Sequence, residues 1–113
     1  MARHPWVKEF PVAVTVSDRN GIILEMNDAS AVTFAEDGGS ALIGKSSLAC
    51  HPEPARSKFE QLLKEPQPNI YTIEKAGVKK LIAQIPWYRE GEFSGVVELS
   101  IRLPEEVPHF VRG

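Results

Sequence analysis

The adjacent residues Cys50 and His51 are the side chains of this 113-residue chain best suited to chemistry. A cysteine beside a histidine can act as a ligand pair, as a redox thiol or as an axial ligand of haem iron. A structural zinc site needs about four ligands, and the chain offers one cysteine and three separated histidines, His4, His51 and His109. Zinc is therefore not expected, whereas haem needs only one axial ligand. The alternative is that this pair packs against, or caps, the start of the next helix.

Residues 39–46, Gly-Ser-Ala-Leu-Ile-Gly-Lys-Ser, match the P-loop pattern. A P-loop follows a buried strand and opens a helix whose N-terminus holds the phosphates. Here the preceding segment has a helical composition, and Pro52 and Pro54 follow within a few residues. We therefore interpret the match as a glycine-containing loop that arose by chance.

The chain carries no arrangement typical of a catalytic centre. It has no Gly-x-Ser-x-Gly elbow. Its acidic pairs, Glu36-Asp37 and Glu105-Glu106, lie in a turn and in the C-terminal segment, where carboxylates are usually just solvated. We therefore expect no enzymatic activity, and no metal site.

The composition is that of an ordinary globular domain, with 42% hydrophobic and 25% charged residues. Thirteen basic and 15 acidic residues give a net charge of -2, without a basic run, so nothing indicates a nucleic-acid or membrane-surface partner. A single cysteine cannot form an intrachain disulfide. The N-terminus has no signal-peptide pattern, and no stretch approaches the roughly 20 apolar residues of a membrane span. These features predict one domain in the cytoplasm.

Hydrophobic periodicity predicts five strands and one main helix. An Asn20-Gly21 turn joins the first two strands, because both residue types tolerate positive φ. Asn27 and Asp28 can cap a short helix. The apolar stripe Ala55, Phe59, Leu62 and Leu63 marks the main helix. The expected strands cover 12–17, 22–26, 69–75, 78–88 and 94–103, and the main helix covers 53–65. Short connections require antiparallel pairing, so the fold class is α+β with helices on one face.

Alternation along the strands predicts how the side chains divide between the two faces of the sheet. Val12, Val14 and Val16 share one face of the first strand. In the last strand we expect Val97, Leu99, Ile101 and Leu103 to face inward; in the long strand before it, Leu81, Ala83, Ile85 and Trp87 share a face. Pro86 should lie at a bulge or an edge, because it lacks the N–H of a ladder.

The chain divides into a lead-in helix at 1–10, a domain at 11–103 and a tail at 104–113. Trp6, Val7 and Phe10 have helical spacing and form an apolar patch, which either joins a dimer or docks on the chain's own sheet. The tail holds two prolines. Met1 and this tail suit a complete short chain.

The order of the elements, together with several short segments, resembles the PAS domain family. The segments are Pro11–Ala29, with its strand, Asp18, Gly21 turn and Asn27; Leu42-Ile-Gly-Lys45; and Gly95-Val-Val-Glu98. The resemblance covers roughly residues 9–103. Cys50-His51-Pro52 is similar to a subgroup of PAS-like modules found after hemerythrin-like regions in bacteria. The Gly-x-Asn-Cys-Arg-Phe-Leu-Gln motif of flavin-binding photosensors is absent.

The resemblance implies a sensor whose sheet curls around the helices and whose ligand, of unknown identity, binds between the concave face and the 53–65 helix. Such a module binds a small ligand or a protein partner and passes the change on through a homodimer or a separate signalling effector protein. The alternatives are a haem or thiol redox sensor using His51 or Cys50, and a purely structural dimeriser. The cavity candidates are Leu24, Met26, Phe34, Cys50, His51, Phe59, Leu63, Ile85 and Leu99, and the dimer-interface candidates are Trp6, Val7 and Phe10.

Overall fold

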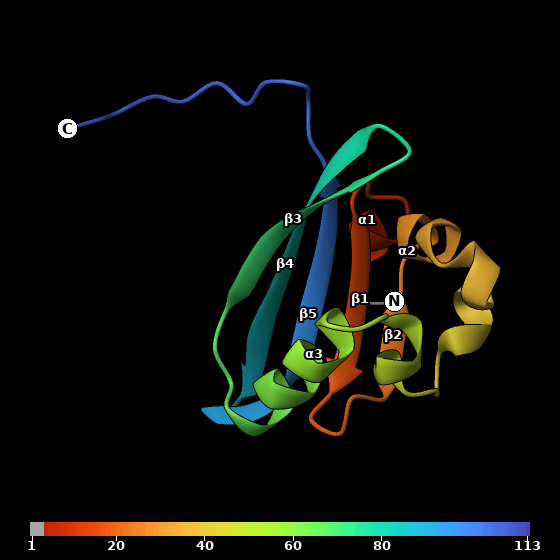
Figure 1. The fold of residues 1–113 in the computed structure, drawn as a ribbon. Helices are drawn as coiled ribbons and strands as arrows, with labels where there is room; N and C mark the ends of the chain where they lie inside the picture. Colours follow the sequence, from red (N-terminus) through yellow and green to blue (C-terminus); the bar gives the residue numbers. More distant parts are fainter. Residues whose placement is uncertain (1–3) are drawn as a thin grey trace.

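The computed structural model describes residues 4–113, apart from the side chain of Cys50. Five antiparallel strands form one sheet in the order β2-β1-β5-β4-β3 (Figure 1). The strands are β1 (Ala13–Asp18), β2 (Ile23–Met26), β3 (Asn69–Lys75), β4 (Val78–Arg89) and β5 (Glu92–Arg102). The helices are α1 (Pro5–Lys8), α2 (Asp28–Thr33) and α3 (Ala55–Lys64), with the 3-10 turns η1 (Ala35–Asp37), η2 (Gly39–Leu42) and η3 (Ser47–Cys50). The predicted α+β class and the five strands are confirmed.

The first hairpin forms where the sequence predicts it. Asp18 Oδ1 accepts hydrogen bonds from the N–H groups of Asn20 and Ile22, at 2.9 and 3.0 Å. Gly21 has a φ of +81°, which is costly for any residue with a Cβ atom. The turn thereby sets the antiparallel pairing of β1 with β2.

Asn27 connects three segments at one end of the sheet. Its Oδ1 accepts from the N–H groups of Ser30 and Val14, at 3.0 and 2.9 Å, so it caps α2 as predicted. Its Nδ2 donates to the carbonyls of Val7 and Val12, at 3.0 and 2.8 Å. Only 2% of Asn27 is exposed. One buried amide therefore holds α1, β1 and α2 together.

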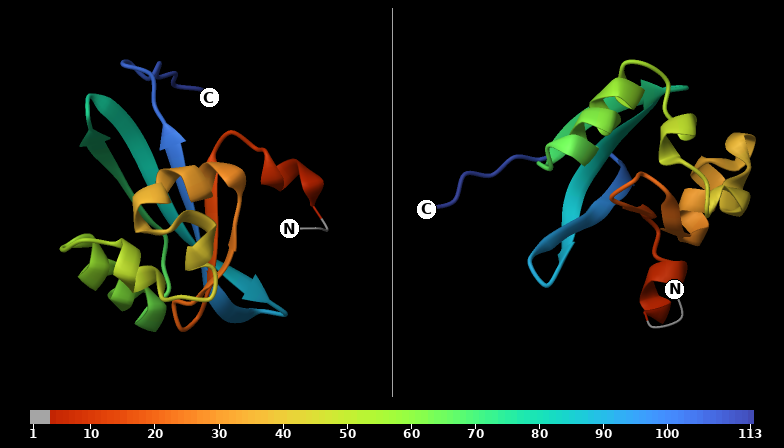
Figure 2. Two further views of the ribbon diagram at one scale, coloured as in Figure 1. Left: turned by 90° about the vertical axis from the view of Figure 1, so that its right-hand side faces the viewer. Right: turned by 90° about the horizontal axis from the view of Figure 1, so that it is seen from below.

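The helices lie on both sides of the sheet, but unequally. In Figures 1 and 2, α3 lies across one face, here called the inner face, while α1 lies on the opposite side near β1. Phe59 and Leu62 of α3 are 2% and 1% exposed, so the centre of the apolar stripe is buried, while Ala55 and Leu63 at its ends are half-buried. Residues 39–46 form η2 followed by a loop and not a strand-loop-helix unit, which agrees with a chance P-loop match.

Along β5, the side chains that we expected to face inward lie on the outer face of the sheet. Val96 and Glu98 contact the same cavity as Phe59, so they lie on the inner face. Val97, Leu99 and the rest of that set must then lie on the outer face, because neighbours in a strand point in opposite directions. The prediction that Val97, Leu99, Ile101 and Leu103 face inward is wrong. The alternation of side chains along a strand divides them between two faces, but it does not identify the face that the helices cover.

Antiparallel register extends this outer face over three strands. Leu99 pairs with Val14 and with Ala83, and Val97 pairs with Val16 and with Ile85. The inner face instead buries Thr15, Ser17, Gln84 and Glu98, none more than 8% exposed. Polar side chains thus lie among the apolar side chains of Ala13, Ile82 and Val96 on the inner face, whereas the outer face is apolar.

Gly95 is required where β1 and β5 pass closely. It has a φ of +152°, and a Cβ atom there would lie 1.9 Å from the Ser17 carbonyl oxygen. The indole N–H of Trp87 donates to the same oxygen at 3.0 Å. The pairing of β4 with β3 ends at Gln84, two residues before Pro86. The missing N–H of Pro86 therefore breaks no ladder on the β3 side of the strand.

Candidate functional site

A small cavity lies between the helices and the inner face of the sheet. It is lined by Thr15, Ser17, Ile23, Phe34, Ser47, His51, Phe59, Val96 and Glu98. The part that the centre of a water molecule can occupy measures about 10 Å³, which is room for about one water. A larger occupant must displace lining side chains or extend beyond the enclosed part of the cavity.

His51 spans the gap between the helical layer and the sheet. Its Nδ1 lies 2.8 Å from the Ser47 carbonyl oxygen and its Nε2 lies 3.0 Å from Glu98 Oε1. Its ring stacks on Phe59 with 5.2 Å between centroids and 24° between planes. Both polar partners are acceptors, so both ring nitrogens are satisfied when each carries a proton. The geometry therefore favours an imidazolium ion beside a carboxylate.

The surroundings of His51 act on its pKa in opposite directions. Burial lowers the pKa, whereas the hydrogen bond to Glu98, the negative charge of Glu98 and the Ser47 carbonyl raise it, and the net pKa lies above 6.5. The side chains of His51 and Glu98 are each 10% exposed, so this pair is screened little by solvent.

Glu98 begins a chain of side-chain amides that crosses the sheet. Gln84 Nε2 donates to Glu98 Oε1 at 2.7 Å, and Asn69 Nδ2 donates to Gln84 Oε1 at 2.8 Å. Burial, and after it the charge of Glu98, raises the pKa of Tyr71 on β3. Strands β5, β4 and β3 are thus linked to η3 through one hydrogen-bonded network.

Local turns fix the position of His51. Ser46 caps η3 by accepting from the N–H of Leu48 at 3.3 Å, and the hydroxyl of Ser47 donates to the Gly21 carbonyl at 2.8 Å. The first hairpin and η3 are therefore tied together directly before His51. The cap on η3 and this tie fix the backbone that leads into His51.

The structure brings together only some of the predicted cavity residues. Phe34, His51 and Phe59 line the cavity. Met26 is half-buried on β2 opposite Thr15, and Leu63 of α3 is half-buried beside the Gly21 turn. The side chain of Cys50 lies outside what the structure describes.

Three predicted cavity residues lie elsewhere. Leu24 is 43% exposed, beside the irregular pairing between β1 and β2. Ile85 and Leu99 lie on the outer face, because their neighbours Gln84 and Glu98 form the inner network. Their expected inward orientation is wrong for the same reason as that of Val97.

Sequence reasoning missed the polar half of the site. Glu98, Gln84 and Asn69 were not among the candidates, and neither was Ser47. The available signal was Glu98 itself, a charged residue among the apolar residues Val96, Val97, Leu99 and Ile101. A carboxylate in such a strand is rarely buried unless it is paired.

The surroundings of His51 do not fit haem. Both ring nitrogens of His51 are engaged by protein acceptors, so neither is free to bind iron. The cavity beside this ring has space for about one water, far less than a porphyrin requires. No group of three or more metal-binding side chains is found in the described part of the chain.

The apolar residues in and beside the lead-in helix α1 differ in their exposure to solvent. Trp6 and Phe10 are 65% and 40% exposed and contact each other edge to face at 5.6 Å. Val7 is buried within its own chain, so its predicted place in a dimer contact does not fit. Within residues 4–113, no helix is long and apolar enough to cross a membrane.

Comparison with known proteins relates the chain to solved structures. No family model matches the sequence, and no curated protein matches it. The PAS domain of Bordetella pertussis BvgS is 25% identical with a TM-score of 0.65, over 92% of this chain and 85% of that chain. The Aer2 receptor of Vibrio cholerae, described as a dual PAS-heme oxygen sensor, is 20% identical with a TM-score of 0.62, over 82% and 95%. The PAS domain of an HTR-like protein from Haloarcula marismortui is 15% identical with a TM-score of 0.63, over 90% and 89%.

Proposed function

We propose that this chain, which has the PAS fold, is a sensory module that receives a signal at the inner cavity and passes it through the sheet. The input is a small ligand or a protein partner that acts on the helical layer. The output is a contact of the outer face with a second copy or with a separate signalling protein. The polar network binds and positions, and we assign it no catalytic step.

The observation that carries this proposal is the double role of β5. Val96 and Glu98 contact the cavity, while Val97 and Leu99 belong to the outer face. These residues alternate along one backbone, so a shift of Glu98 displaces its neighbours on the other side. Strand β5 is also paired on both edges, with β1 and β4, so the displacement extends to both.

Because the cavity is small, we expect a bound ligand to move the residues that line it. We expect an occupant larger than about one water to displace the wall formed by η3 and α3. That wall is tied to the sheet by the contact between His51 and Glu98. Removing one partner of a buried ion pair costs about 3–5 kcal/mol, so a ligand that separates them must supply groups that replace the lost contacts.

The output side is the apolar outer face. Its half-buried side chains are continuous over β1, β5 and β4, and α1 with the exposed Trp6 lies on the same side of the sheet (Figure 2). Large apolar patches on a soluble domain mark interaction sites. A homodimer through this side is the form of output that we propose.

Nuclear magnetic resonance with a panel of small molecules tests the proposal. Imidazole, guanidinium, acetate and phenol are each titrated into ¹⁵N-labelled protein, and amide shifts are followed on both faces. We expect a panel member to move the amides of Val96 and Val97 together and saturably. The same titration of Glu98→Gln should abolish these shifts, whereas the exposed control Glu36→Gln should retain them.

Two outcomes of this titration contradict the proposal. One is saturable binding at the cavity without any change on the outer face, which would leave a binding module without transmission. The other is no binding at the cavity by any panel member, which would favour a purely structural dimeriser.

A further inference from the structure

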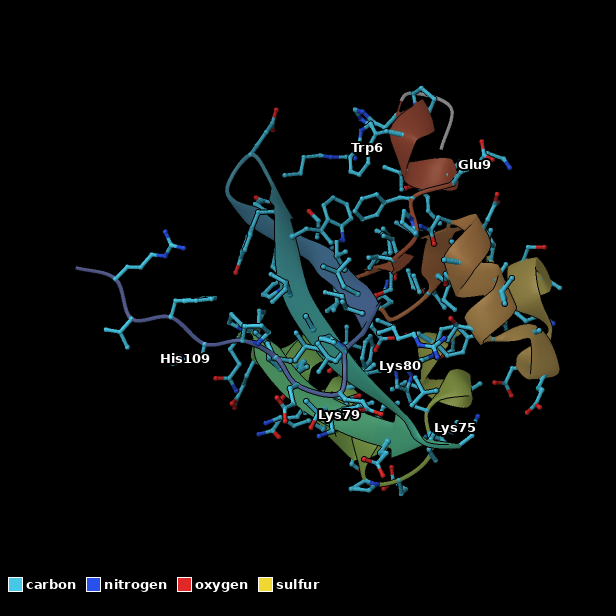
Figure 3. All side chains as sticks on the ribbon, turned by 90° about the horizontal axis from the view of Figure 1, so that it is seen from above. Trp6, Glu9, Lys75, Lys79, Lys80 and His109 are labelled. Carbon is cyan, nitrogen blue, oxygen red and sulfur yellow. The ribbon has the colours of Figure 1, made fainter. Side chains whose placement is uncertain are left out.

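The C-terminal tail, residues 104–113, exposes apolar side chains that the rest of its own chain does not cover. It contains no helix or strand, and Val107, Phe110 and Val111 are 60%, 71% and 88% exposed. Figure 1 shows the tail leaving the end of β5 and running away from the sheet, and Figure 3 shows His109 on it, apart from the body.

Two prolines explain why the tail is an extended arm. The N–H of Leu103 donates to the Lys79 carbonyl at 2.9 Å, which is the last backbone contact between β5 and its neighbour β4. Pro104 has no N–H, so the ladder cannot continue, and its fixed φ sends the chain out of the sheet. Pro108 then prevents a helix from forming across the middle of the tail and favours an extended backbone.

The outer face offers a surface of matching chemistry. Its apolar side chains lie on three adjacent strands: Val14, Val16, Leu81, Ala83, Ile85, Trp87, Val97, Leu99 and Ile101. All except Ala83 are half-buried by their neighbours and still partly open to solvent. The helices α2 and α3 contribute nothing to this face, because they lie on the other side of the sheet (Figure 2).

The length of the tail matches the length of that surface. Ten extended residues span roughly 33 Å, and the 11 residues of β5 cover about the same distance at 3.3 Å each. The arm is therefore long enough to lie along the whole outer face. Figure 1 shows it running away from its own sheet, a direction in which it can reach another molecule.

We propose that the arm of one copy of this chain lies on the outer face of a second copy, in a reciprocal two-fold exchange. This inference rests on the proposed homodimer and names the segment that holds it together. Phe110 is the anchor, since buried aromatic side chains dominate interface energies. Val107 and Val111 flank it, and Glu105 and Glu106 stay at the rim. Because each copy receives the arm of the copy on which its own arm lies, the reciprocal exchange closes at two.

Sedimentation equilibrium of the full chain and of a chain ending at Leu103 tests the exchange. The arm makes no hydrogen bond to the described body beyond Leu103, so the shortened chain should keep the far-ultraviolet circular dichroism of the domain. We expect the dimer dissociation constant to rise at least tenfold without the arm. Val111→Ser should weaken the dimer, whereas the matched control Val32→Ser, with 76% of Val32 exposed on α2, should not.

Crosslinking locates the arm. Protein with p-benzoylphenylalanine in place of Phe110 is mixed with ¹⁵N-labelled protein and irradiated, and mass spectrometry assigns each crosslink to one copy or to two. Crosslinks from residue 110 to Leu81 or Ile101 of the other copy support the exchange. Crosslinks within one chain, or to another surface, overturn it.

The dimer measurement separates the two proposals. A dimer of unchanged affinity without the arm overturns the exchange and leaves the sensory dimer standing. A chain that is monomeric with and without the arm overturns the exchange and also the homodimeric output, although not ligand binding at the cavity.

Discussion

The free energy of unfolding should fall as the pH rises above 6.5, and His51 should be the cause. The pKa of His51 is raised in the folded chain, so its protonated form contributes fully to stability below the unfolded value near 6.5. This contribution is lost as the pH rises through the folded pKa. One linked proton limits the slope to about 1.4 kcal/mol per pH unit, against a total stability of about 5–15 kcal/mol.

Urea titrations at pH steps from 5.5 to 9, at one fixed protein concentration, measure this slope. His51→Gln should remove it, while His4→Gln, which deletes an exposed histidine, should leave it in place. The raised pKa of Tyr71 acts above pH 10 and lies outside this range. Equal slopes for wild type and His51→Gln, or a stability that rises with pH across this range, would refute the assignment of an imidazolium ion to the pair.

Three further substitutions test the packing that positions the site, each by urea denaturation. Gly95→Ala should lower the free energy of unfolding by about 3 kcal/mol or more, because the new Cβ atom would lie 1.9 Å from a carbonyl oxygen. The control Gly77→Ala, in open space with positive φ, should lower it by only about 1 kcal/mol. Equal losses of stability in the two variants would contradict the close approach at Gly95. Phe59→Ala should cost about 3–5 kcal/mol, and a loss near zero would mean that α3 does not hold the cavity closed. Asn27→Ala should cost about 3 kcal/mol, from a lost cap and unsatisfied buried partners, whereas the exposed Asn20→Ala should stay within about 0.5 kcal/mol.

Local chemistry made the elements predictable from the sequence. The Gly21 turn, the cap at Asn27 and the stripe around Phe59 each depend on residues close together in the chain, and each forms as expected. The strand ends shift by no more than two residues, as in β5, which begins at Glu92. Such boundaries depend on pairing with distant strands, which local patterns do not encode.

The site was only half predictable, because buried polar residues lie on the inner face of the sheet and a continuous apolar set lies on the outer face. Alternation placed Leu99 inward because apolar faces usually pack on helices. Here the inner face holds Glu98 and Gln84, whose burial is tolerated only because His51 and Asn69, distant in sequence, complete their hydrogen bonds. Such a network exists only after the fold brings η3 and β3 to β5.

Sedimentation equilibrium of Glu98→Gln most directly tests whether the inner site controls the outer face. The substitution keeps the size of the side chain and removes the charge that His51 faces, deep inside the monomer. The account predicts a changed dimer dissociation constant, by at least threefold, with an unchanged constant for the exposed control Glu36→Gln. Identical association of wild type, Glu98→Gln and the control, with Glu98→Gln folded, would show that the two faces of the sheet act independently and would contradict the sensory account.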